Sequence, residues 1–238
     1  MITPFSVLDT RTKEWKQRKD HWITTYGIQS ELGREDIKSK SQFWESTSNV
    51  SIFDPVLCEL MYDWFVPKGG KILDPFSGGS VRGIVAHEMG FHYDGIDLSQ
   101  NQIIANQKQS SGPNWIVGDS DKEIFFLDSD YDFVFTCPPY YDLEVYSDNV
   151  SDLSTLNERK FDQKYEKIIY KSVTKLKENR FFGIVVSEVR NTSTTGSYSI
   201  GNYRKLVSKT IEMCEKHGLK FYNDMVLFNS QHQASRVG

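Results

Sequence analysis

Residues 71–99 read KILDPFSGGSVRGIVAHEMGFHYDGIDLS, and this stretch decides the fold class. The apolar run from Lys71 to Leu73 predicts a strand, the glycine pair at 78–79 predicts a tight turn, and Val81 to Met89 has the character of a helix. A second apolar run, Tyr93 to Ile96, predicts the next strand. Strand, turn, helix and strand in this order form the βαβ unit of a parallel sheet. The sequence therefore predicts an α/β fold, with helices on both faces of a mainly parallel sheet.

The same alternation extends over most of the chain. Asp54 and Pro55 are placed as N-cap and first-turn residues of a helix over about Pro55 to Phe65. Two polar stretches without periodicity, 141–157 and 191–201, predict long loops. The other expected elements are helices over 99–109, 161–176 and 203–216, and strands over 115–117, 133–136, 181–189 and 220–228.

The first 50 residues differ from the rest and predict an N-terminal extension to a catalytic domain over 51–238. Between Arg11 and Lys19 the chain carries five basic residues and one acid, with Trp15 and Trp22 within and beside them. This pattern suits an arm that contacts DNA phosphates. It suits equally a solvated helix face whose tryptophans pack on the core.

Composition narrows the function classes. The 238 residues are 38% hydrophobic and 25% charged, which suits one globular domain. No export signal or membrane segment is indicated, so we expect a cytoplasmic protein without a membrane partner. Three cysteines and five histidines have no ligand spacing, so we expect no metal site. The net charge of −4 argues against a protein that coats nucleic acid without sequence preference, but it is compatible with a local basic patch.

The turn that begins at Asp74 allows a ligand to approach the backbone at the carboxyl edge of the sheet. Asp97 ends the following strand about 20 residues further on, the interval at which an acid binds ribose hydroxyls. The turn lacks the three-glycine spacing of the dinucleotide fingerprint, and no P-loop lysine follows it. These features favour a ribose-containing cofactor other than a nicotinamide dinucleotide or a nucleoside triphosphate.

A second motif, Thr136-Cys137-Pro138-Pro139-Tyr140, follows the predicted strand over 133–136. Its two prolines end the strand and fix the backbone at the same sheet edge. Methyl transfer to an exocyclic amine requires acceptors that draw the nitrogen lone pair out of conjugation with the base ring. The Pro138 carbonyl and the Cys137 side chain can serve as such acceptors, while the Tyr140 ring stacks on a flipped base. Read alone, the proline pair is a chain break and Cys137 a small buried hydrophobe.

Together these residues resemble the S-adenosylmethionine-dependent DNA amino-methyltransferases, which act on adenine N6 or cytosine N4. The resemblance covers most of Ser51 to Phe228, and the run YYDLEVYS at 140–147 is similar to phage and prophage DNA modification methylases. It implies a Rossmann-like class I methyltransferase fold, S-adenosyl-L-methionine as cofactor, and duplex DNA with a flipped base as substrate. A place in DNA modification or restriction-modification follows from the same resemblance.

The resemblance also assigns roles to individual residues. Phe53 and Asp54 would line the methionine end of the cofactor, Asp97 would hold the ribose, and Asp119 would approach the adenine. The implied catalytic residues are Cys137, Pro138, Pro139 and Tyr140. The implied cofactor-binding residues are Phe53, Asp54, Asp74, Pro75, Phe76, Ser77, Gly78, Gly79, Asp97, Leu98 and Asp119.

The chain departs from the family pattern in two places. The leading catalytic residue of the family is usually aspartate, asparagine or serine, whereas this chain has Cys137, which leaves adenine and cytosine both open as targets. The family sheet ends in a hairpin with a seventh strand, whereas this chain stops at Gly238 soon after the sixth expected strand, so we expect the final strand to be missing. Two other functions stay open: an RNA base N-methyltransferase, and a catalytically silent, methyltransferase-like DNA-binding subunit.

Overall fold

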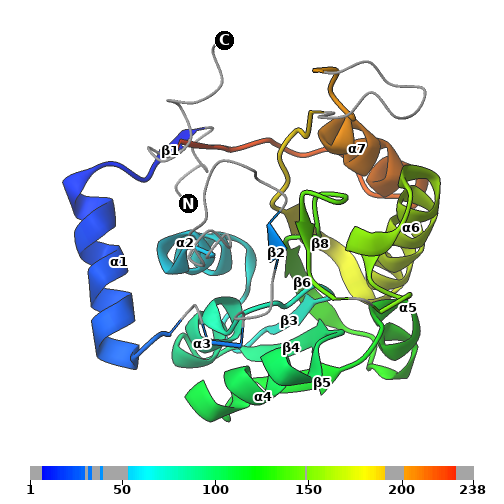
Figure 1. Ribbon diagram of the computed structural model, residues 1–238. Helices are drawn as coiled ribbons and strands as arrows, with labels where there is room; N and C mark the ends of the chain where they lie inside the picture. Colours follow the sequence, from blue (N-terminus) through cyan, green and yellow to red (C-terminus); the bar gives the residue numbers. More distant parts are fainter. Residues whose placement is uncertain are drawn as a thin grey trace.

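The computed structural model describes residues 7–29, 32–33, 38–39, 53–147, 149–190 and 201–228. Its centre is a five-stranded sheet in the order β5-β4-β3-β6-β8, and every neighbouring pair of strands is parallel (Figure 1). This arrangement confirms the predicted mainly parallel α/β sheet. The strands are β3 (Lys71–Asp74), β4 (His92–Asp97), β5 (Asn114–Val117), β6 (Tyr131–Thr136) and β8 (Leu176–Ile184).

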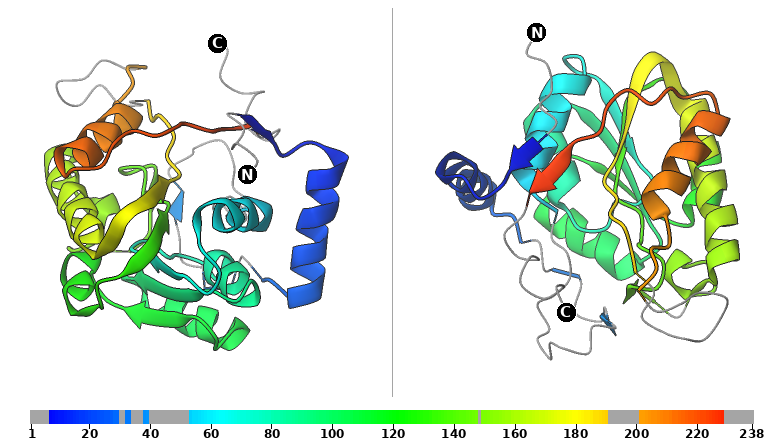
Figure 2. Two further views of the ribbon diagram at one scale, coloured as in Figure 1. Left: turned by 180° about the vertical axis from the view of Figure 1, so that it is seen from behind. Right: turned by 90° about the horizontal axis from the view of Figure 1, so that it is seen from above.

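Helices cover both faces of the sheet (Figures 1 and 2). One face carries α2 (Pro55–Phe65), α3 (Val81–Glu88) and α4 (Gln100–Gln109), and the other carries α5 (Ser120–Glu123), α6 (Glu158–Lys175) and α7 (Leu206–Lys216). Because neighbouring residues of a strand point to opposite faces, Ile72 joins the apolar cluster under α2 and α3, while Leu73 joins the cluster under α6. Two continuous apolar cores thus hold the sheet between helices.

Side-chain caps explain where several helices begin. The Asp54 carboxylate accepts a hydrogen bond from the Val56 amide at 2.9 Å, and α2 has the bounds expected from its Asp-Pro start. The Ser99 hydroxyl accepts from the Gln102 amide at the start of α4. Shorter elements complete the described chain: β1 (Val7–Asp9), β2 (Lys38–Ser39) paired with β7 (Glu144–Val145), β9 (Val226–Phe228), and the 3₁₀ helices η1 (Ile124–Phe126) and η2 (Leu153–Thr155).

The N-terminal segment forms a helix, α1 (Lys13–Tyr26), that packs against α2. Trp22 is 3% exposed and belongs to the same core cluster as α2, and its indole donates a hydrogen bond to Glu59 at 2.6 Å. Three of the five basic residues in this region are paired with acids: Arg11 with Asp9, Arg18 with Glu59 and Lys19 with Asp54. The tryptophans therefore pack on the core, and contact between this helix and DNA stays a prediction.

The expected strands at the C-terminal end differ from the observed ones. The strand expected over 181–189 runs instead over 176–184, with a register shift against β6 where Asn179 has φ 57°. The strand expected over 220–228 is wrong in extent, because only Val226–Phe228 is a strand, and it pairs in parallel with β1. Leu227 packs against the core cluster that contains Leu8, and this burial draws the segment across the molecule to β1 (Figure 2). The expected loop over 191–201 lies almost entirely outside the described residues.

Replacing Trp22 by alanine is predicted to lower the free energy of unfolding by about 3 kcal/mol, because a buried indole and its hydrogen bond to Glu59 are lost. Urea denaturation measures the change. Ile23→Ala is the matched control, because Ile23 is on the same helix and 36% exposed. Equal losses in the two variants would contradict the docking of α1.

Candidate active site at the carboxyl edge of the sheet

The two sequence motifs meet at one edge of the sheet. Because β3 lies between β4 and β6, the ends of these three parallel strands are neighbours. Asp97 ends β4, Asp74 ends β3 and Thr136 ends β6. The sheet order therefore brings the glycine turn, Asp97 and the start of the proline motif together, at the edge where open α/β sheets bind ligands.

Asp74 joins these segments by its side chain, which is fully buried. Its Oδ1 accepts hydrogen bonds from the Thr136 hydroxyl at 2.7 Å and from the Phe76 amide at 3.1 Å. Its Oδ2 accepts from the Tyr93 hydroxyl at 2.7 Å and from Arg82 Nε at 2.5 Å. Burial and the charge of Asp74 raise the pKa of Tyr93 well above its usual value, so its hydroxyl stays a donor. The carboxylate of Asp74 thus fixes the strand ends and the turn, and its oxygens are used within the protein.

Arg82 is the partner that the sequence analysis missed. Its guanidinium pairs with Asp74 and also donates from Nη2 to the Phe76 carbonyl at 2.5 Å and to the Ser77 carbonyl at 2.9 Å. Burial alone would lower the pKa of Arg82, but the charge of Asp74 more than offsets this and raises it above the usual value. The guanidinium carbon also lies 4.3 Å from the ring centroid of Phe53. The available signal was an arginine near the start of the helix predicted over 81–89, beside apolar residues.

The glycine turn is tied to the end of β4. The Ser77 amide donates to the Ile96 carbonyl at 2.9 Å, and the Gly78 amide donates to Asp97 Oδ2 at 3.0 Å. Gly78 has φ 51°, in the left-handed region that glycine tolerates best. The Asn106 side-chain amide donates to the Gly78 carbonyl at 2.8 Å and holds the turn against α4. Asp97 therefore lies directly beside the turn, as its spacing predicted.

Two hydroxyls in this turn are buried without a hydrogen-bond partner within the described chain. They belong to Ser77 and Ser80, whose exposed fractions are 0% and 1%. Buried polar atoms in native proteins are nearly always satisfied, by protein, water or ligand. The turn therefore has unused hydrogen-bonding capacity at the position where the sequence predicts a cofactor.

The proline motif continues from β6. The Tyr140 hydroxyl lies 3.6 Å from Cys137 Sγ and donates to the Val185 carbonyl at 3.3 Å. Burial raises the pKa of Tyr140 far above its usual value, which keeps this hydroxyl protonated. Pro138 is buried, and Cys137, Pro139 and Tyr140 are half-buried. The Tyr140 hydroxyl is thus held by the protein, and stacking of its ring on a base stays a prediction.

The residue after the motif, Tyr141, is held by a charged network that sequence reasoning did not find. It is fully buried with φ 54°, and the Arg204 guanidinium carbon lies 3.8 Å from its ring centroid. The Lys209 ammonium donates to the Tyr141 hydroxyl at 3.2 Å and to Asp162 at 2.7 Å. Arg204 also pairs with Asp142 at 2.5 Å and with Glu158 at 3.1 Å. This network fixes the end of the motif to α6 and to the start of α7.

The remaining predicted residues lie around this centre with partners of their own. Phe53 contacts Phe135 edge to face, with ring centroids 5.6 Å apart. Asp54 caps α2 and pairs with Lys19 at 3.2 Å. Asp119 caps α5 and pairs with Lys164 at 2.7 Å, while the neighbouring Ser120 hydroxyl donates to the Pro75 carbonyl at 2.5 Å. Leu98 follows Asp97 directly and is half-buried.

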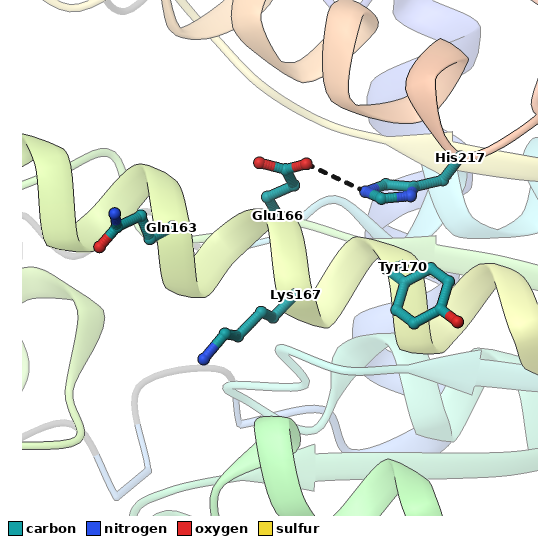
Figure 3. Close-up of a pocket in the computed structure, with 5 residues that line it drawn as sticks. All are labelled: Gln163, Glu166, Lys167, Tyr170 and His217. Carbon is teal, nitrogen blue, oxygen red and sulfur yellow. Dashed lines mark hydrogen bonds and ion pairs between the residues drawn. The ribbon is translucent and has the colours of Figure 1, made fainter.

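A separate hollow lies between α6 and α7, on the side of α6 that faces away from the sheet (Figure 3). Its one carboxylate already has partners, since Glu166 contacts His217 at 3.2 Å and pairs with Lys216 at 2.5 Å. The lining residues are Gln163, Glu166, Lys167, Tyr170 and His217. None of them belongs to the two motifs, so the sheet edge is the candidate active site.

Among the described residues, no group of three or more His, Cys, Asp or Glu side chains could hold a metal ion. Nor do any of the described helices combine the length and apolar character that crossing a membrane requires.

Comparison with known proteins supports the fold. No protein-family model and no curated protein matches the sequence. A putative sarcosine dimethylglycine methyltransferase from Galdieria sulphuraria matches with TM-score 0.50 at 13% identity, over 85% of this chain and 74% of that one. A TehB-like SAM-dependent methyltransferase from Corynebacterium glutamicum matches with TM-score 0.48 at 20% identity, over 70% and 74% of the two chains. A putative rRNA methylase from Clostridium thermocellum matches with TM-score 0.47 at 14% identity, over 72% and 86%. At such identities the likeness concerns the fold, which is the Rossmann-like class I methyltransferase fold.

Replacing Arg82 by methionine is predicted to lower the free energy of unfolding by about 3 to 5 kcal/mol, because the buried Asp74 carboxylate loses its counter-ion. Arg18→Met is the control: it removes the arginine of a surface ion pair with Glu59. Because the Arg18 side chain is 45% exposed, this loss should cost about 1 kcal/mol or less. Urea denaturation of both variants measures the difference. Similar losses would show that the Asp74–Arg82 pair does not organise the turn.

Proposed function

We propose that the protein transfers a methyl group from S-adenosylmethionine to an exocyclic amino group of a flipped DNA base, either adenine N6 or cytosine N4. One observation carries the proposal: the ends of the adjacent strands β4, β3 and β6 place Asp97, the glycine turn and the Thr136 to Tyr140 motif side by side. The glycine turn with Asp97 has the chemistry for a ribose-containing cofactor, and the motif from Thr136 to Tyr140 has the chemistry for a planar amine.

The residues around the turn fit the cofactor. Ser77 and Ser80 have unpartnered buried hydroxyls, and the Asp97 carboxylate stands beside the turn. Asp97 would accept hydrogen bonds from the ribose hydroxyls, and the Phe53 ring held by Arg82 would border the methionine end. Asp119, with its Lys164 partner, would border the adenine. When bound, S-adenosylmethionine supplies an electrophilic methyl group on a sulfonium centre.

The proline motif would orient the amine. The Pro138 carbonyl and the Cys137 sulfur would accept the two amino hydrogens, which directs the nitrogen lone pair away from the base ring. The Tyr140 hydroxyl, fixed on the Val185 carbonyl, restrains the thiol beside it. The Tyr141 network keeps this backbone from shifting, and positional precision is a large part of what such a site contributes to rate.

DNA is the proposed substrate because of the resemblance at 140–147 to DNA modification methylases. Outside the site, α1 presents Lys13 and Lys16 to solvent, and such side chains suit contact with a phosphate backbone. The loop after the motif is anchored by Lys164, which donates to the Ser151 carbonyl at 2.6 Å. Such a fixed loop is a suitable element for reading base edges.

Labelled methyl transfer to mixed genomic DNA, followed by nucleoside mass spectrometry, tests the proposal. N6-methyladenine or N4-methylcytosine is the expected product, and its identity names the base. Transfer RNA and ribosomal RNA are offered in parallel, and methylation confined to RNA would overturn DNA as the substrate. Cofactor binding without transfer to any acceptor would identify a silent subunit.

Asp97→Ala and Tyr140→Ala should have opposite effects. Loss of the Asp97 carboxylate should weaken S-adenosylmethionine binding at least tenfold, because hydrogen bonds to a charged group contribute about 1.5 to 3 kcal/mol. Loss of the Tyr140 ring should lower kcat by about tenfold or more with little change in cofactor affinity, since base stacking contributes about 1 to 3 kcal/mol. Calorimetry and steady-state kinetics separate the two, and the reverse pattern would refute the assignment of roles.

Cys137→Ser should retain activity, because a hydroxyl is at least as good a hydrogen-bond acceptor as a thiol. The measurement is kcat with the substrate identified by mass spectrometry, alongside the melting temperature as a control for folding. An inactive but folded variant would point instead to a role that only a thiol can perform.

A further inference from the structure

Glu188 is an acidic residue at the sheet edge that belongs to neither sequence motif. It lies just beyond β8, on the same edge as Asp97 and the proline motif. Its Oε2 atom is buried and has no hydrogen-bond partner in the part of the chain that the structure describes. A buried carboxylate oxygen without a donor is costly, so this atom needs a donor from outside the described protein groups.

The backbone on either side of Glu188 is attached to the proline motif. Before it, the Val185 amide donates to the Thr136 carbonyl at 2.9 Å, and the Val185 carbonyl accepts from Tyr140. After it, the Val189 carbonyl accepts from the Arg204 amide at 2.8 Å, and the Arg204 guanidinium covers the Tyr141 ring. The segment that carries Glu188 is therefore fixed at both ends to the residues that would orient the amine.

Two arginines that follow Glu188 in the chain, Arg190 and Arg204, have other partners. Arg190 donates to the Gly201 carbonyl at 2.8 Å and to the Tyr203 hydroxyl at 2.6 Å. Arg204 donates to Asp142 and Glu158. With both guanidinium groups bound elsewhere, neither arginine supplies a donor to the buried Oε2 atom of Glu188.

We propose that Glu188 is a catalytic residue that accepts a hydrogen bond from the target amino group and takes its proton; this rests on the proposed function. Cys137 stands at the motif position where a stronger acceptor is usual, and Glu188, which follows the end of β8, takes its place as the acceptor of the second amino hydrogen. In the step, the amine lone pair forms the new N–C bond while the C–S bond of the sulfonium breaks with its electron pair on sulfur. The proton released by the nitrogen passes to the Glu188 carboxylate.

Glu188→Gln tests the proposal, because the amide keeps the shape of the side chain and removes its charge and basicity. Single-turnover methyl transfer should fall about 100-fold, in the range of general-base contributions. Calorimetric affinity for S-adenosylmethionine and the melting temperature should stay at wild-type values. Glu178→Gln is the matched control, since Glu178 is an exposed glutamate on β8 and should change none of these quantities.

A rescue experiment separates an acceptor from a structural role. If the two positions serve the same amine, the double variant Glu188→Gln with Cys137→Asp should be at least ten times more active than Glu188→Gln alone. Binding gives a readout independent of turnover. Wild type should prefer DNA that contains the target base over DNA whose base lacks the amino group, and Glu188→Gln should lose about fivefold of this preference.

The outcomes are distinguishable. Wild-type protein that methylates no DNA overturns the proposed function and this inference with it. If the wild type methylates DNA and the Glu188→Gln variant is equally active, the role of Glu188 is overturned while the proposed function stands. A loss of activity that is accompanied by weaker cofactor binding, or that Cys137→Asp does not restore, assigns Glu188 a structural part and contradicts its role as acceptor.

Discussion

The buried ion pair between Asp74 and Arg82 is the interaction on which the candidate site depends. Burying two charges is costly, and the cost is recovered only when the remaining hydrogen-bonding capacity is satisfied as well. Here the carboxylate also accepts from Thr136 and Tyr93, and the guanidinium also donates to two turn carbonyls. One pair thus connects the ends of β3 and β6, Tyr93 near the start of β4, helix α3 and the glycine turn.

This arrangement separates the parts of the site that fix geometry from those that can meet a ligand. The oxygens of Asp74 are fully used inside the protein, whereas the buried hydroxyls of Ser77 and Ser80 have no partner within the described chain, and Asp97 lies beside the turn. A second charged network, around Tyr141, performs the same function for the proline motif. The two networks hold opposite sides of the sheet edge, so that a cofactor and an amine could be placed in a fixed relation.

Local signals were sufficient to predict much of this architecture from sequence. The Asp54-Pro55 pair specified the start of α2, and the interval between Asp74 and Asp97 specified a βαβ unit with an acid beside its turn. Tertiary contacts decided the rest. Arg82 and Arg204 act through partners distant in sequence or on other elements. Strand β9 pairs with β1, which lies far away in the sequence, and Leu227 packs there against the cluster that contains Leu8. Trp15 and Trp22 fitted either a DNA-binding arm or a packed helix until their burial was known.

A crystal structure of the protein with S-adenosylhomocysteine would test the central claim most directly. The account predicts that the ligand lies along the carboxyl edge of β3 and β4, with its ribose hydroxyls on the Asp97 carboxylate and polar atoms within reach of the Ser77 and Ser80 hydroxyls. A ligand found elsewhere, such as the hollow between α6 and α7, or a turn that excludes it, would contradict the account.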